Sequence, residues 1–98
     1  MNVHQCTQAF ITLMDALRMD RRDGDEIQPL LSDVITTLNA VHGIQGVKEE
    51  WVLVLDRWSK KVRDMRANDQ LDEETARQLI FDVEKSYRSF GDFLSKPS

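Results

Sequence analysis

Apolar residues recur along most of the chain at spacings of three and four residues, and strict alternation of apolar and polar positions is nearly absent. Residues at these spacings share one face of a helix, so the pattern predicts four amphipathic helices at about residues 3–21, 27–42, 47–66 and 72–94. The first two apolar stripes are Val3, Cys6, Phe10, Leu13, Met14 and Leu17, then Ile27, Leu30, Leu31, Val34, Leu38 and Val41. The other two are Trp51, Leu55, Trp58, Val62 and Met65, then Ala76, Leu79, Ile80, Val83, Tyr87, Phe90 and Leu94.

Short polar or glycine-containing stretches separate these segments. We expect Gly24 to adopt the left-handed conformation that ends the first helix, and Pro29 to lie in the first turn of the second helix, where a proline is tolerated. Gly43 and Gly46 mark a loop, and Asp72 is a good N-cap for the fourth helix. Helices joined by short loops neighbour one another antiparallel. The sequence therefore predicts an all-α, antiparallel up-down four-helix bundle, with residues 1–98 forming one domain.

Composition and charge narrow the classes of function. The chain has 98 residues with 13 Lys and Arg against 17 Asp and Glu, and the resulting net charge of −4 argues against a nucleic-acid-binding module. No apolar run is long enough for a membrane span, so we expect no direct membrane insertion. The first residues do not resemble a signal peptide, and a single cysteine cannot form an internal disulfide. These features favour a cytoplasmic location.

The sequence holds no recognisable catalytic motif. His4 and Cys6 lie close together and His42 lies beside a loop, but a metal site needs further ligands nearby. No serine lies in a Gly-x-Ser-x-Gly motif, no glycine-rich phosphate loop is present, and the Glu-x-x-His signature of di-iron bundles is missing. We expect no enzymatic activity, no metal and no cofactor.

Three apolar residues miss the predicted core stripes: Met19, Leu53 and Phe81. Phe81 points about 160° away from the centre of its stripe, into polar surroundings. An exposed aromatic ring beside an arginine is typical of a binding hot spot, although a tail or loop of the same chain would equally cover it. Met19 and Leu53 are adequately explained as scattered exposed side chains.

Two charged regions are further candidates. The loops after the first and third helices lie at one end of such a bundle, which gathers Arg21, Arg22, Asp23, Asp25, Glu26, Asp69, Asp72, Glu73 and Glu74 there. We favour stabilisation of helix starts over a docking platform as the role of most of these carboxylates. The third helix carries several basic residues, namely Arg57, Lys60, Lys61, Arg63 and Arg66. Asp56 and Asp64 interleave them, which favours an ordinary solvated face.

Several stretches together resemble a known family. They are Asp25-Glu26-Ile27-Gln28-Pro29, Trp58 with Met65, Leu71-Asp72-Glu73, and Arg77-Gln78-Leu79-Ile80-Phe81-Asp82-Val83-Glu84 with Tyr87 and Phe90. From about Phe10 to Leu94 the chain resembles the carboxy-terminal domain of vacuolar protein sorting-associated protein twenty-eight, a subunit of the ESCRT-I complex. The resemblance implies a four-helix bundle, in agreement with the periodicity. It also implies an excised domain that lacks the amino-terminal part contacting other ESCRT-I subunits.

The function implied by this resemblance is recruitment without catalysis. Family members connect ESCRT-I to an ESCRT-II zinc-finger subunit or to an ESCRT-III subunit during multivesicular-body sorting of ubiquitinated cargo, peripherally on the endosomal membrane. Helical geometry places the candidate docking surface on the outer face of the fourth helix, at Arg77, Gln78, Phe81, Glu84, Lys85 and Arg88. We expect the domain to be monomeric. The alternatives are a homo-oligomerisation or scaffold module unrelated to sorting and, with less support, a cofactor-binding bundle.

Overall fold

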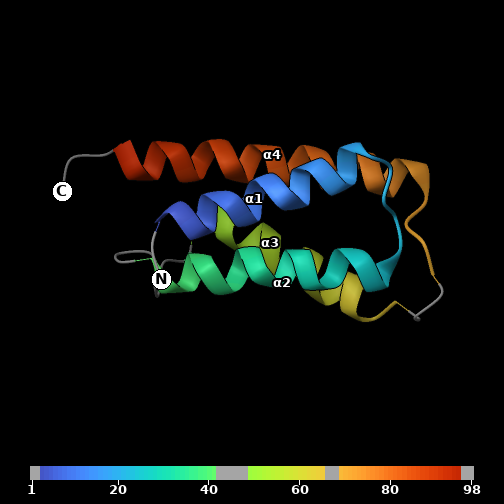
Figure 1. Cartoon of the computed structure of the whole chain (residues 1–98). Helices are drawn as coiled ribbons and strands as arrows, with labels where there is room; N and C mark the ends of the chain where they lie inside the picture. The colour runs from blue at the N-terminus through green and yellow to red at the C-terminus, as the bar shows by residue number, and fades with distance from the viewer. Residues whose placement is uncertain (1–2, 42–48, 66–68, 96–98) are drawn as a thin grey trace.

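The fold is known from a computed structural model of the chain, which describes residues 3–41, 49–65 and 69–95. Four helices make up the regular structure of these residues: α1 (Val3–Arg18), α2 (Gly24–Ala40), α3 (Glu50–Arg63) and α4 (Glu73–Ser95). They run along the long axis of a body measuring 44 × 21 × 20 Å (Figure 1). Each helix packs against two neighbours in the cyclic order α1–α2–α3–α4, so the helices occupy the corners of a square. The predicted all-α bundle is confirmed.

The buried side chains form one cluster in the centre of this square. Aromatic rings from α1, α3 and α4 pack together in this core and at its edge. The ring centroids of Phe10 and Phe90 lie 5.6 Å apart, those of Phe10 and Tyr87 5.4 Å, and those of Trp51 and Phe90 6.3 Å. Such offset and tilted pairs stabilise a core beyond the burial of their area. Most positions of the stripes are thus confirmed as the core, whereas Val3 and Leu94 near the helix ends are exposed. Six other stripe residues are only partly buried against the core: Leu30, Trp51, Met65, Ala76, Ile80 and Tyr87.

The first helix ends differently from the prediction. α1 stops at Arg18, because Asp20 adopts a left-handed conformation with φ of 66°. The N–H groups of Asp20 and Arg21 donate to the carbonyls of Leu17 and Ala16, at 3.1 and 3.0 Å, which satisfies the last turn. Asp tolerates this conformation better than most residues. The prediction that Gly24 ends the first helix was therefore wrong.

The second helix begins earlier than predicted. Gly24 is the first residue of α2, and its N–H donates to the carbonyl of Asp69 at 3.1 Å. Pro29 consequently lies in the second turn, not in the first as expected. Its ring removes the N–H that would otherwise bond to the carbonyl of Asp25. The start of α2 is thus determined partly by contact with a distant loop.

Two loops at one end of the bundle are joined to each other. The N–H of Leu71 donates to the carbonyl of Arg22 at 2.9 Å, and the side-chain amide of Gln70 donates to Asp23 at 2.7 Å. The bond from the Leu71 N–H and the bond from the Gly24 N–H to the Asp69 carbonyl form an isolated antiparallel bridge between Asp23 and Gln70, and the side-chain bond joins the same two residues. The connection from α1 to α2 and the connection from α3 to α4 therefore lie at one end, as predicted for an up-down bundle.

The remaining helix bounds show smaller differences. α3 begins at Glu50 because Glu49 is still extended, and it ends at Arg63. Of its predicted span, residues 47, 48 and 66 lie outside the described residues, as does residue 42 of the predicted second helix. α4 begins at Glu73, directly after Asp72, whose carboxylate accepts the N–H of Thr75 at 2.7 Å. Asp72 is therefore the N-cap, as predicted. In the described part of the chain, no helix is both long and apolar enough to cross a membrane.

Candidate functional site

The outer face of α4 carries the six residues that the sequence singles out for docking. Arg77, Gln78, Phe81, Lys85 and Arg88 are exposed, and Glu84 is half-buried. Phe81 has 51% of its surface exposed, and no described segment of the chain covers its ring. The exposure of Phe81 is therefore confirmed, whereas its role in binding stays a prediction.

The carboxylates beside Phe81 are already engaged within the bundle. Glu84 accepts a 2.6 Å bond from Arg18 of α1. Asp82 accepts the indole N–H of Trp58 at 2.8 Å with one oxygen and the amide of Gln78 at 3.0 Å with the other. These contacts tie α4 to both of its neighbours, since α1 and α3 flank it.

The first turn of α4 carries a similar pair. Glu73 accepts a 2.6 Å bond from Arg77, and this guanidinium lowers the pKa of the Glu73 carboxyl. By contrast, Lys85 and Arg88 form no ion pair with any described residue. The middle of the α4 face thus presents two basic side chains that form no ion pair with a described residue, next to an exposed aromatic ring.

A groove beside this face was not predicted from the sequence. It lies between α3 and α4, has a volume of about 470 Å³, and includes Trp51, Val54, Lys85 and Ser89 in its lining. Trp51 and Glu49 both line the groove, and the indole N–H of Trp51 donates to the Glu49 carboxylate at 2.9 Å. In the sequence, the four-residue spacing of Lys85 and Ser89 places both on one side of α4. This spacing indicates a groove only when α3 is known to lie beside that side of α4.

The other exposed apolar candidates have different outcomes. Met19 is exposed, with 65% of its surface accessible, as expected. Leu53 is half-buried, so it is less exposed than predicted, but it misses the core as expected, since it is not among the side chains packed against the buried cluster. Glu50 and Arg57 form a 2.6 Å ion pair that spans two turns of α3 along the side holding Leu53. Long charged side chains of this kind shield apolar neighbours from water.

The carboxylates at the charged end of the bundle lie near the starts of α2 and α4. The backbone N–H of Thr75 lowers the pKa of Asp72, as a cap hydrogen bond to the ionised carboxylate should. Glu26, in the first turn of α2, lies 3.0 Å from Arg21, and Asp20 lies 2.8 Å from Arg22. For Asp72 this arrangement agrees with stabilisation of a helix start, whereas Asp23, the N-cap residue of α2, makes no cap hydrogen bond and accepts the side-chain amide of Gln70 instead.

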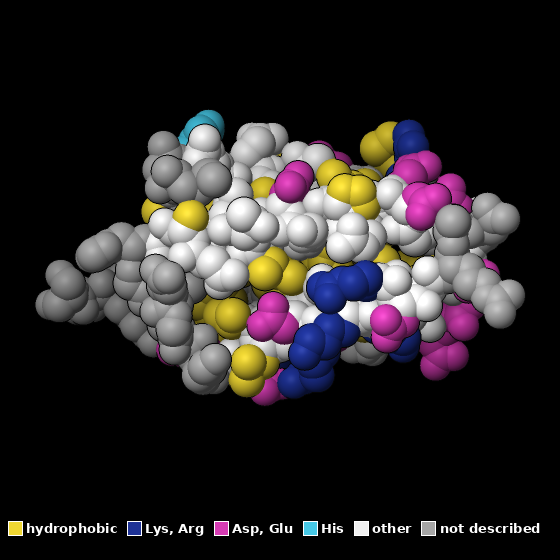
Figure 2. Space-filling model, turned by 90° about the horizontal axis from the view of Figure 1, so that it is seen from below, with side chains coloured by type: hydrophobic (Ala, Val, Ile, Leu, Met, Phe, Trp, Pro, Cys, Tyr) yellow, Lys and Arg dark blue, Asp and Glu magenta, His cyan; other side chains and the backbone are white. Residues whose placement is uncertain are grey.

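The basic residues of α3 are also largely partnered. Arg57 pairs with Glu50, the ammonium of Lys61 lies 5.3 Å from the centre of the Trp58 ring, and Arg63 donates to Ser59 at 3.3 Å. Arg66 lies outside the described residues. Figure 2 shows the dark blue side chains gathered on the face that includes α2 and α3, with carboxylates among them. The picture agrees with a solvated face of mixed charge.

No metal or catalytic constellation emerges from the described ranges. Within residues 3–41, 49–65 and 69–95, no three His, Cys, Asp or Glu side chains gather as metal ligands would. Cys6 is fully buried in the core, and burial raises the pKa of its thiol. His4, two residues away, is exposed on α1, and His42 lies outside the described residues. The side chains of His4 and Cys6, which are close in the sequence, therefore lie in different environments, one exposed and one buried.

Comparison with known proteins identifies the family. The model of the VPS28 protein family matches residues 1–94. The chain belongs to the VPS28 family. Among solved structures, the chain is similar to the X-ray structure of the yeast ESCRT-I Vps28 C-terminus, with a TM-score of 0.84 and 31% sequence identity. This similarity covers 93% of the present chain and 89% of the yeast one.

Curated members of the VPS28 family show the same relationship in sequence. The chain is 41% identical over 88 residues to vacuolar protein sorting-associated protein 28 homolog 1 of Arabidopsis thaliana, which is 90% of this chain and 42% of the plant protein. It is 38% identical over 89 residues to the Dictyostelium discoideum protein, which is 91% of this chain and 31% of that protein. The chain thus spans less than half the length of these relatives.

Proposed function

We propose that this chain is a protein-binding module of ESCRT-I that recruits a zinc-finger subunit of ESCRT-II or a subunit of ESCRT-III through the outer face of α4. In this role it acts without catalysis in the sorting of ubiquitinated cargo at multivesicular bodies. It lies in the cytoplasm and reaches the endosomal membrane only as part of the complex. Membership of the VPS28 family and the similarity to the yeast ESCRT-I Vps28 C-terminus support this proposal.

The observation that carries the choice of surface is the exposed ring of Phe81. It is the one aromatic ring among the exposed large apolar side chains of the described residues. A ring of this size supplies a large apolar contact area when a partner covers it, and aromatic anchors of this type dominate many interfaces. The groove beside Lys85 would extend the contact toward α3.

Charge indicates what kind of segment binds here. Lys85 and Arg88 are uncommitted, whereas Asp82 and Glu84 are already bonded within the bundle. Glu74 and Asp92 bound this region at its two ends on α4. A partner segment with an apolar side chain for Phe81 and acidic side chains for Lys85 and Arg88 satisfies both features, because charge complementarity selects the register of an interface.

An amide-shift titration of the isotope-labelled chain tests the proposal. The ESCRT-II zinc finger and the ESCRT-III subunit are added separately, and we expect shifts between Arg77 and Arg88 with at least one of them. Phe81→Ala should weaken this binding about 30-fold, which corresponds to loss of about 2 kcal/mol from a hot-spot residue. Arg77→Ala should weaken it less, because Arg77 is partly engaged by Glu73.

A matched control variant distinguishes binding at this site from nonspecific hydrophobic binding. Leu94→Ala removes another exposed apolar side chain, about 140° around α4 from Phe81, and should leave the affinity unchanged. Shifts confined to the charged end of the bundle would retain the recruiting function and refute the α4 surface. Absence of shifts with both partners would refute the recruiting function of this chain.

A further inference from the structure

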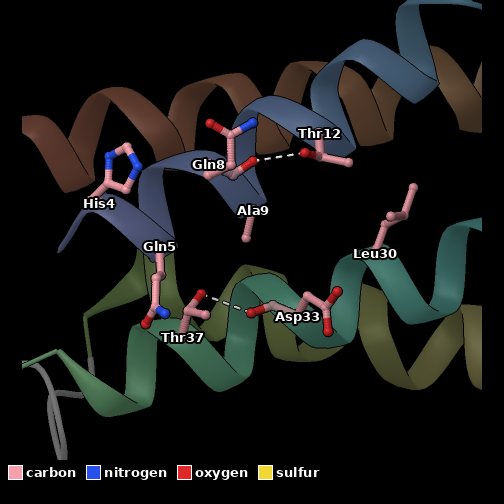
Figure 3. A pocket seen from close by; sticks show the side chains of 8 residues that line it. All are labelled: His4, Gln5, Gln8, Ala9, Thr12, Leu30, Asp33 and Thr37. Carbon is pink, nitrogen blue, oxygen red and sulfur yellow. Dashed lines mark hydrogen bonds between the residues drawn. The ribbon is translucent and has the colours of Figure 1, made fainter. Parts of the chain in front are cut away.

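A groove runs along the bundle between α1 and α2, on a different side from the α4 face. It consists of two adjoining cavities of about 460 and 440 Å³, which share Thr12 and Leu30 in their linings. Figure 3 shows the first cavity, with Ala9 of α1 and Leu30 of α2 projecting toward the space between the helices. Because the two cavities share lining residues, they form one continuous channel from His4 to Met19.

The floor of this channel is apolar. Ala9 and Ala16 of α1 are short, so they leave room above them, and Pro29 and Leu30 of α2 form the opposite side. Met19, with 65% of its surface exposed, stands at one end. An apolar floor open to water gains free energy when another apolar surface covers it.

The rim of the channel is acidic. Four carboxylates line it, against one guanidinium, that of Arg21: Asp15, Asp25, Glu26 and Asp33. Arg21 is already engaged by Glu26 at 3.0 Å, and Asp15 has only a 3.9 Å contact with Arg18. Asp25 and Asp33 form no ion pair with any described residue. The channel therefore combines an apolar floor with carboxylates on both helices, and those without an ion pair among the described residues lie on α2.

We propose that this channel binds a basic amphipathic helix of a partner protein. A helix satisfies its own backbone hydrogen bonds, whereas an extended segment would place its N–H and C=O groups against a floor with few partners for them. From His4 to Met19 the channel is about 22 Å long at 1.5 Å per residue, the length of a helix of about four turns. Apolar side chains spaced by three and four residues would follow the floor along this length.

The spacing of the carboxylates supports a helical occupant. Asp25 and Asp33 are eight residues apart on α2, which is about 12 Å or two turns. Lys or Arg side chains two turns apart on the bound helix would reach both, while Asp15 faces the occupant from α1. This helix is a different ligand from the acidic segment expected at the α4 face, so the two surfaces can be occupied independently.

Fluorescence anisotropy with a designed peptide tests the proposal. The probe is a labelled helical peptide of about 18 residues, with Leu at spacings of three and four and Lys on both flanks of the stripe. Its control has the same composition with the Leu positions scrambled. We expect the striped peptide to bind at least about tenfold more tightly, and its affinity to fall as salt rises from about 50 to about 500 mM, because screening weakens the ion pairs.

Variants of the chain locate the binding site. Thr12 is exposed and lines both cavities, so Thr12→Arg should block the channel without loss of core packing and weaken binding at least about tenfold. The matched control is Asn39→Arg, an exposed position about 180° around α2 from Leu30, which should leave binding unchanged. Asp25→Asn with Asp33→Asn provides a second test, and should weaken binding about threefold and flatten the salt dependence.

Several results would overturn the proposal. Equal affinity for the scrambled peptide, or full binding by Thr12→Arg, would show that the channel is not the site. Amide shifts that cluster around Phe81 would place the peptide on α4 instead. A chain dimer in sedimentation that Thr12→Arg dissociates would show that a second copy is the occupant. Because Phe81→Ala should leave peptide binding intact, failure here and failure of the recruiting function are separable.

Discussion

Phe81 and Phe90 lie on the same helix but in opposite environments, which makes them a matched pair for one substitution. Phe81 is 51% exposed, whereas Phe90 is 1% exposed and packs against the rings of Phe10 and Trp51. Phe90→Ala removes a fully buried ring, so we expect it to lower the free energy of unfolding by about 3–5 kcal/mol. Phe81→Ala loses about half of one ring's burial, about 1 kcal/mol, and regains about 0.5 kcal/mol from the higher helix propensity of Ala.

Urea denaturation followed by circular dichroism at 222 nm measures both effects. With a slope of about 1.5 kcal/mol per M, the midpoint should fall by about 2 M or more for Phe90→Ala and by less than about 0.7 M for Phe81→Ala. An unchanged slope in both variants is the control that the unfolding transition is the same. If Phe81→Ala lowers the midpoint as much as Phe90→Ala, the Phe81 ring is buried in solution, and the α4 surface loses its anchor.

Three further substitutions or treatments test other parts of the structure. Asp82→Ala leaves the indole N–H of Trp58 without its acceptor and should lower the free energy of unfolding by about 1–3 kcal/mol, measured by urea denaturation; an unchanged value would show that this bond is not formed. The pKa of Asp72 is lowered in the folded state by the N–H of Thr75, so its charge stabilises the fold above the unfolded pKa of about 3.9. The stability advantage of the wild type over Asp72→Asn should therefore be lost as pH falls through the folded pKa, and an advantage independent of pH would refute the cap. Cys6 is buried with a raised thiol pKa, so Ellman's reagent should modify it at least about a hundredfold more slowly than in the urea-unfolded chain.

Much of the fold was predictable because helical periodicity is a local property of the chain. The apolar stripe of α4, from Leu79 to Phe90, identified the buried face of this helix correctly. The same helical periodicity placed Phe81 on the exposed face. Asp72 was recognisable as an N-cap because the cap bond joins residues only three apart. Leu53 is less exposed than its position on the helix suggests, since helical periodicity takes no account of long charged side chains such as the paired Glu50 and Arg57 on the same side of α3.

The helix ends were less predictable because contacts between distant residues help to determine them. Gly24 is a reasonable helix terminator by local rules, yet its N–H bonds to Asp69 and it opens α2. Asp20 supplies the left-handed turn instead. Local propensities could not distinguish these two positions, since both residue types tolerate positive φ.

By itself, the sequence determined the number of helices, the buried face of each and the all-α class, because the spacing of apolar residues decides which sides must leave water. The tertiary structure alone decided which helices adjoin and with what rotation. That rotation brings Arg18 to Glu84 across 66 residues, so the carboxylate beside Phe81 is paired, while Lys85 has no ion pair with any described residue. It also sets Ala9 opposite Leu30 and so opens the acidic channel between α1 and α2. Side chains on different helices meet only after the helices have packed, and no spacing along the chain records that geometry.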